Sequence, residues 1–226
     1  EGFIQFTPGY TFSIIGMEHD LIHPATGSDR PLFIGELDIP SAYQIQNIRD
    51  QSAVLAKNFI NINIESGNDV DIENVTLTNN YDVAATAIAI NNASNVTLKD
   101  IDVGTELGIG DNYYPTGIKI NTANTVNINN VNIHAPLGIK NAPVVGLDIE
   151  NVTSDVTLSG VNIGDTAGAT GNYPIGLKLN NIAATRVDNS AIYAGATENT
   201  NDTIGISCMQ SGSLTINNSI IDVKTT

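Results

Sequence analysis

The sequence contains an internal repeat of about 29–30 residues, a fixed period that restricts the possible folds more than any other feature. Five segments share the pattern glycine or alanine, apolar, any residue, apolar: residues 87–90, 117–120, 146–149, 176–179 and 205–208. An earlier copy, residues 61–64, stands slightly closer to the first of them than the five stand to one another. A regular period of this kind is typical of repeat architectures, in which each copy is one structural unit.

Two further short apolar motifs follow in every copy. The second motif comprises Val96/Leu98, Val126/Ile128, Val156/Leu158, Thr185/Val187 and Leu214/Ile216. The third motif comprises Ile101/Val103, Val131/Ile133, Val161/Ile163, Ser190/Ile192 and Ser219/Ile221. All three motifs alternate inward and outward positions, which is the pattern of a β-strand with one buried face, and no segment sustains the 3.6-residue period of a helix.

The arrangement that buries these apolar positions is a solenoid in which equivalent strands stack about 4.8 Å apart. One internal column is then Ile90, Ile120, Ile149, Leu179 and Cys208, and another is Val96, Val126, Val156, Thr185 and Leu214. The inward position of Cys208 predicts a buried apolar side chain and not a nucleophile. The sequence therefore predicts an all-β fold, a parallel solenoid with coils of about 29–30 residues.

A polar pair separates the second motif from the third in each copy. The pairs are Lys99-Asp100, Asn129-Asn130, Ser159-Gly160, Asp188-Asn189 and Asn217-Asn218. Asparagine tolerates the left-handed backbone of tight turns, so this position predicts a corner repeated in every coil. Such corners account for the 29 asparagines without a functional role.

These motifs, for example residues 117–121 and 126–133, resemble the right-handed parallel β-helix of the pectate-lyase-like superfamily, with no specific member indicated. The resemblance covers residues 58–223 and implies a right-handed solenoid, with a sugar cleft beside the sheet of first strands. The superfamily's calcium-binding Asp clusters with a basic catalytic residue are missing here. The Asn-Thr-Asp, Asp-Asp, Gly-His-Gly and Arg-Ile-Lys motifs of polygalacturonase-like enzymes are missing as well, so no catalytic residue of the superfamily is carried over.

The first part of the chain lacks the repeat. Segments 2–6, 10–15 and 32–34 have the apolar character of irregular opening strands. We expect residues 1–52 to form an irregular N-terminal cap or opening coils, and residues 53–226 to form regular coils in one continuous domain.

The charge balance excludes several classes of partner. Nine Lys and Arg against 24 Asp and Glu give a net charge of −15, which argues against a nucleic-acid surface and against docking on anionic lipid. No apolar run is long enough for membrane insertion. The single cysteine excludes an internal disulfide and a Cys-x-x-Cys motif.

The outward positions of the first strands carry the candidate catalytic residues. Asp148 and Glu150 lie about 6.5–7 Å apart along one strand face, within the roughly 6.5–9.5 Å range of an inverting carboxylate pair. Lys119 and Lys178 occupy the same position on the flanking coils. They are expected to keep both carboxylates ionised, whereas a general acid needs a raised pKa. The alternative interpretation is a Lys–Asp–Lys ladder that relieves like-charge stacking.

Candidate binding residues surround the same face. Tyr114 and Tyr173 each precede a proline just before a first strand, and their rings either stack on sugar rings or cover the edges of the coils. Asn121 and Asn180 stand at the strand edge next to the two lysines. We therefore name Lys119, Lys178, Tyr114, Tyr173, Asn121 and Asn180 as candidate binding residues.

One acidic strand is a candidate cation site. Asp69, Asp71 and Glu73 share an outward face, and Ca²⁺ favours several oxygen ligands, so bound calcium is the one cofactor considered. The three histidines, His19, His23 and His134, lack metal-ligand spacing and are interpreted as solvated or hydrogen-bonded side chains.

These observations favour a secreted or cell-surface module of bacterial, adhesin-like type that binds glycan or protein along its lateral face without catalysis. The alternative is a divergent polysaccharide lyase or glycoside hydrolase acting on an extracellular polysaccharide. Ice binding is a third reading, but Asn127 and Arg186 interrupt its threonine column of Thr97, Thr157 and Thr215. The last coil has no amphipathic capping segment, so further sequence, an unseen cap or self-association through this open end is expected.

Overall fold

A computed structural model describes residues 12–19, 33–35, 43–50, 62–64, 67–77, 86–104, 116–134, 145–164, 175–195 and 203–224. These residues form fifteen strands in one sheet, with every pair of neighbouring strands parallel. No helix long and apolar enough to cross a membrane occurs among them.

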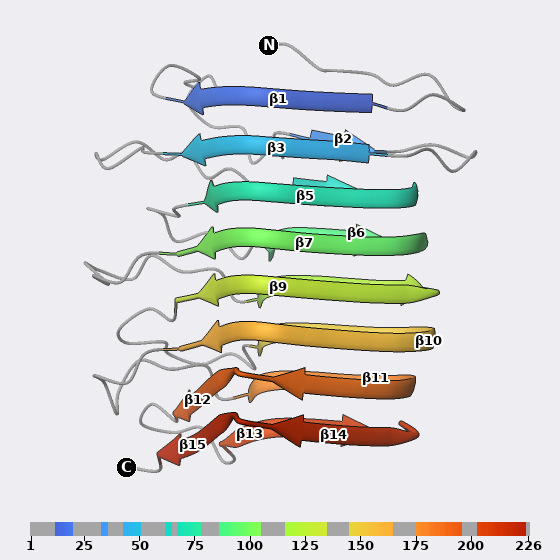
Figure 1. The fold of residues 1–226 in the computed structure, drawn as a ribbon, viewed down its shortest axis with the longest axis vertical. Coiled ribbons are helices and arrows are strands. Elements are labelled where there is room, and N and C mark those ends of the chain that lie inside the picture. Colours follow the sequence, from blue (N-terminus) through green and yellow to red (C-terminus); the bar gives the residue numbers. More distant parts are fainter. Residues whose placement is uncertain are drawn as a thin grey trace.

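The strands stack into a solenoid, with the N-terminal strands at one end and the C-terminal strands at the other (Figure 1). The first motif forms one row: β2 (Phe33–Gly35), β4 (Ile62–Ile64), β6 (Thr86–Asn91), β8 (Thr116–Ala123), the first parts of β10 (Val145–Ile163) and β11 (Ile175–Asp188), and β13 (Ile204–Met209). The second motif forms another: β1 (Phe12–His19), β3 (Tyr43–Asp50), β5 (Gly67–Leu77), β7 (Ala93–Val103), β9 (Thr125–Ile133), the later parts of β10 and β11, and β14 (Ser213–Asn217). The third motif continues the second in β5, β7, β9 and β10, and forms separate strands in β12 (Ala191–Gly195) and β15 (Ile220–Lys224).

The predicted register is confirmed. In the first row Ile90 pairs with Ile120, Ile120 with Ile149, Ile149 with Leu179 and Leu179 with Cys208. The second column pairs in the same way, in the order Val96, Val126, Val156, Thr185 and Leu214. Nearly all of these aliphatic side chains before the last coil are fully buried in one continuous core. Because one alternating face per strand enters this core, burial of apolar surface is the main force that stacks the coils.

The glycine that opens the repeat is explained by packing. A Cβ atom on Gly117 would come within 2.4 Å of Cγ2 of Ile133, and one on Gly176 within 2.4 Å of Cγ2 of Ile192. The first-row strand therefore approaches the third-motif isoleucine of the same coil so closely that only glycine fits easily.

The corners have the left-handed backbone that the polar pairs predict. The second residue of every pair has a positive φ: Asp100, Asn130, Gly160, Asn189 and Asn218. A second corner, which was not predicted, lies between the first and second rows, where φ is positive at Asn92, Thr122, Asn151, Asn181 and Gln210. The asparagines at 92, 151 and 181 were the available signal, but Thr122 and Gln210 obscured it.

Strand β10 has one residue more than its neighbour β11 between its first- and second-row parts. Val152 pairs with Ile182, whereas Asp155 pairs with Ala184, so the register shifts by one residue between them. This bulge explains how the coil length can change by a single residue while the buried columns stay in register.

Strands within the first fifty residues continue the stack. β1 pairs with β3 and β3 with β5, while β2 pairs with β4. β1 and β2 overlap the expected opening strands at 10–15 and 32–34, β3 was not anticipated, and segment 2–6 lies outside the described residues.

The prediction that Cys208 is buried is wrong. Cys208 is exposed although it occupies the inward column, and Leu214 and Ile216 of the same coil are exposed as well. The inward direction follows from the repeat, but a column is buried only where a further coil stacks over it. In the described structure no strand pairs with the outer edge of β13, β14 or β15.

Candidate functional site

The candidate catalytic residues lie in an outward row that crosses the first-row strands. Ala89 pairs with Lys119, Lys119 with Asp148, Asp148 with Lys178 and Lys178 with Ser207. The predicted order of charges, lysine, aspartate, lysine, is therefore present on three successive coils. Glu150 lies two residues beyond Asp148 on β10, in register with Asn121 and Asn180.

Asp148 is buried, which the alternation of the strand did not predict. Its exposed fraction is 6%, and five consecutive residues of β10, from Val145 to Ile149, are all buried. The outward face of the solenoid is therefore covered at this position, and the carboxylate has lost most of its water. Burial of a charged group requires a compensating partner.

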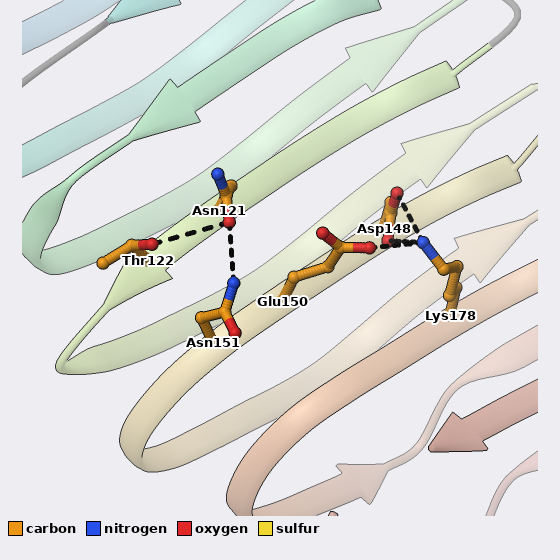
Figure 2. A network of polar contacts seen from close by, with 6 residues as sticks. All are labelled: Asn121, Thr122, Asp148, Glu150, Asn151 and Lys178. Atoms are coloured by element: carbon orange, nitrogen blue, oxygen red, sulfur yellow. Dashed lines mark hydrogen bonds and ion pairs between the residues drawn. The ribbon is translucent and has the colours of Figure 1, made fainter. Parts of the chain in front are cut away.

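Lys178 is that partner, and it contacts both carboxylates (Figure 2). Its Nζ lies 3.2 Å from Oδ1 and 3.3 Å from Oδ2 of Asp148, and it also donates a hydrogen bond to Oε1 of Glu150. Oδ1 of Asp148 is buried and has no well-aligned hydrogen bond, so the ion pair is its only compensation among the described residues. Lys119 has no ion-pair partner among them.

The two carboxylates respond to this environment in opposite ways. Burial raises the pKa of Asp148, outweighing the opposing effects of the Lys178 ammonium and of Lys119. The hydrogen bond from Lys178 lowers the pKa of Glu150, which is less buried. The sequence-based expectation considered only the flanking lysines, whereas loss of solvation at Asp148 acts in the opposite direction.

Two neighbouring carboxyl groups whose pKa values are shifted in opposite directions are typical of a general acid and a general base. The position of Lys178 argues against this catalytic role. An inverting pair needs space between its carboxyl groups for a water molecule and the scissile bond. The Lys178 ammonium lies in contact with both groups and occupies that space (Figure 2). As arranged, the cluster is a partly buried ion-pair network of Asp148, Glu150 and Lys178, and among the described residues Lys119 takes no part in it, so only the Asp148–Lys178 half of the predicted ladder is present.

Amide side chains form a second polar row at the neighbouring corner. Asn151 donates to Oδ1 of Asn121 at 3.0 Å, and Asn181 donates to Oδ1 of Asn151 at 2.8 Å (Figure 2 draws the first bond). Asn121 is thus tied into a ladder along the solenoid axis, whereas Asn180 has no side-chain partner among the described residues. The remaining binding candidates, Tyr114 and Tyr173, lie outside the described residues.

The acidic strand β5 presents its carboxylates to protein partners. Asp69 accepts a hydrogen bond of 2.7 Å from Asn95, and Glu73 forms an ion pair with Lys99. Asp71 lies between them on the same face and pairs in register with Thr97. No group of three histidine, cysteine, aspartate or glutamate side chains within the described ranges is placed to hold a metal ion.

His134 lies in contact with an acidic side chain of the neighbouring coil. Its Nε2 lies 2.8 Å from Oδ1 of Asp102, one coil earlier, and the imidazole is largely buried. His134 also lines a pocket of about 270 Å³ at the carboxyl ends of the third-motif strands, together with Asn132, Asn162, Gly164, Ala191 and Tyr193. The pocket was not predicted, because the repeat places these residues in register on three coils but does not show that a hollow forms between their side chains.

Comparison with known proteins identifies no relative, so the function of the chain has to be inferred from the geometry described above. No protein-family model, no curated protein and no solved structure matches the chain. The parallel β-solenoid is therefore established by the strand pairing itself.

Proposed function

We propose that this chain is a non-catalytic binding module of a secreted or cell-surface protein, and that it binds a saccharide chain along the lateral face of the solenoid. Its relation to the pectate-lyase-like superfamily is part of the same proposal, supported by the repeat pattern and the parallel stack. The observation that carries the proposal is the Lys178 bridge, because its ammonium contacts both of the carboxylates that a hydrolase would need and occupies the space between them.

The lateral face also has the chemistry of a polymer-binding surface. Its outward rows repeat donors and acceptors once per coil, at intervals of about 4.8 Å. Lys119, Asn121 and Asn180 supply such groups in the first row. Saccharide hydroxyls act as both donor and acceptor, so a chain of sugars matches a surface of regularly spaced amides and ammonium groups.

A glycan array probed with the purified chain tests the proposal, together with a reducing-end assay on the bound glycans. We expect binding without turnover, and we expect Lys119→Gln to weaken it. Lys99→Gln is the matched control, because Lys99 lies in the second row and pairs with Glu73. Absence of binding to every glycan would reject the proposal.

An enzyme is the second candidate, favoured by the raised pKa of Asp148 beside the lowered pKa of Glu150. A lyase and hydrolase panel on extracellular polysaccharides distinguishes the two candidates. Cleavage that disappears in the double variant Asp148→Asn with Glu150→Gln would establish the enzyme and reject the binding module.

A further inference from the structure

The pocket beside His134 has a regular origin in the coil repeat. Gly104, His134, Gly164 and Tyr193 are equivalent positions on four successive coils, each directly after the third-motif pair or within its strand. The backbone N–H of His134 donates to Val103 at 2.8 Å, and that of Gly164 donates to Ile133 at 2.8 Å. Tyr193 follows Ile192, which pairs with Ile163.

Two ring side chains therefore lie on either side of a glycine. His134 and Tyr193 are two coils apart, which separates their backbones by about 9.6 Å, twice the strand spacing. Gly164 lies between them, has a φ of 75°, and leaves the space open because it has no side chain. This gap accommodates a ring that is thicker than an aromatic ring, such as a puckered pyranose.

The polar groups of the pocket match sugar hydroxyls. Asn162 donates to Oδ1 of Asn132 at 2.9 Å, which fixes the orientation of both amides. This bond leaves the Nδ2 donor of Asn132 and the Oδ1 acceptor of Asn162 without a protein partner in the described part of the chain. A hydroxyl group uses a donor and an acceptor placed side by side.

The charge around the pocket selects a neutral ligand. No lysine or arginine lines the pocket, and His134 faces the Asp102 carboxylate. The net charge of −15 adds a repulsive field for anions. Uronic acids and phosphorylated sugars therefore lack a counter-charge here.

We infer that the pocket between His134 and Tyr193 binds one neutral pyranose ring of a saccharide chain. This inference rests on the proposed function and deepens it, because it names a subsite and a sugar class. Tyr193 supplies a ring face for the C–H surface of the sugar, while Asn132 and Asn162 hold its hydroxyl groups.

The test titrates the ¹⁵N-labelled chain with the methyl glycosides of glucose, galactose, mannose, xylose and N-acetylglucosamine, and with galacturonate as the anionic comparison. We expect saturable amide shifts centred on Gly164 and Tyr193 with at least one neutral glycoside, and none with galacturonate. Gly164→Asn fills the pocket and Tyr193→Ala removes the ring, so each should lower the affinity about tenfold or more. Tyr193→Phe keeps the ring face and should retain most of the binding.

Gly160→Asn is the matched control. Gly160 lies four residues earlier, within β10, also has a positive φ, and its equivalents in other coils are mostly asparagines. A Cβ atom there meets no atom closer than 3.7 Å, so the variant should fold and bind like the wild type. Absence of shifts at Gly164 and Tyr193 with all five neutral glycosides would overturn the inference, as would undiminished binding by Gly164→Asn. If a glycan binds the array but does not respond to these variants, the subsite fails while the proposed function stands.

Discussion

The ammonium of Lys178 lies 3.2 Å from Oδ1 of Asp148, one coil earlier, and the carboxylate that it meets is almost completely buried. Two equivalent outward positions on stacked strands thus form an ion pair in a covered site. The buried pair depends on both members, because removing one leaves an uncompensated charge.

The first prediction follows from the opposite pKa shifts of Asp148 and Glu150. A raised pKa in the folded state means that Asp148 contributes its full stability below the ordinary value of 3.8, and that this contribution is lost as the pH rises through the folded-state pKa. For Glu150, whose folded-state pKa is lowered, the contribution is present above the ordinary value of 4.5 and is lost as the pH falls through the folded-state pKa.

Thermal unfolding between about pH 3 and about pH 7 measures these contributions. The melting temperature of Asp148→Asn relative to the wild type should increase with pH, because the variant no longer buries a charge. That of Glu150→Gln should decrease with pH, because the variant loses a stabilised carboxylate. Relative melting temperatures that change in the same direction for both variants would contradict the arrangement.

The second prediction concerns the buried column. Ile149→Asp places an unpaired charge in the core and should destabilise the fold by more than about 4 kcal/mol. Cys208→Asp also introduces an aspartate in the same column, two coils later, where the position is exposed. That variant should cost less than about 1 kcal/mol in chemical denaturation. Equal losses for the two variants would show that the stacking register is wrong.

The third prediction tests the left-handed corners. Asn130 has a φ of 52° and donates to Oδ1 of Asp100 at 2.6 Å. Both Asn130→Ala and Asn130→Gly remove that hydrogen bond, so their difference isolates the backbone. The alanine variant should be less stable than the glycine variant by about 1 kcal/mol, measured by urea unfolding, because alanine has a Cβ that opposes positive φ. A more stable alanine variant would exclude the left-handed corner.

The fourth prediction concerns calcium. Asp69 and Glu73 already have the protein partners Asn95 and Lys99. We expect EDTA to leave the melting temperature unchanged, because removal of a bound ion would otherwise lower it by mass action. A decrease that added Ca²⁺ reverses would place a cation on the acidic strand β5.

The fifth prediction concerns the exposed end of the stack. β13 and β14 contain no charged residue, and the last coil exposes Ile216, Ile220 and Ile221. Edge strands that avoid pairing usually carry charges, so we expect a second copy of the chain to pair with the uncharged edges of β13 and β14, despite Asp222 and Lys224 in β15 and the acidity of the rest.

Sedimentation velocity should accordingly show concentration-dependent dimers. Ile220→Lys should shift the chain to monomer, whereas Asn127→Lys adds the same charge to an exposed lateral position and should leave the dimer intact. A monomeric wild type at all concentrations, or a dimer that survives Ile220→Lys, would reject this contact.

The sequence by itself determined the all-β class, the coil length, the inward columns and the left-handed corner at positions such as Asn130. These features are local or strictly periodic: alternation sets the direction of each side chain, and a fixed spacing sets which residues pair. The same rule placed Asp148 between Lys119 and Lys178.

Only the tertiary structure decided how much water reaches each position. Alternation directs Asp148 outward and Cys208 inward, yet Asp148 is buried and Cys208 is exposed. Burial depends on what lies over a side chain, and that comes from other coils and other parts of the chain, which a period cannot encode. The pocket between His134 and Tyr193 likewise arises from three coils: the repeat aligns its residues, but the space between their side chains follows only from how the coils stack.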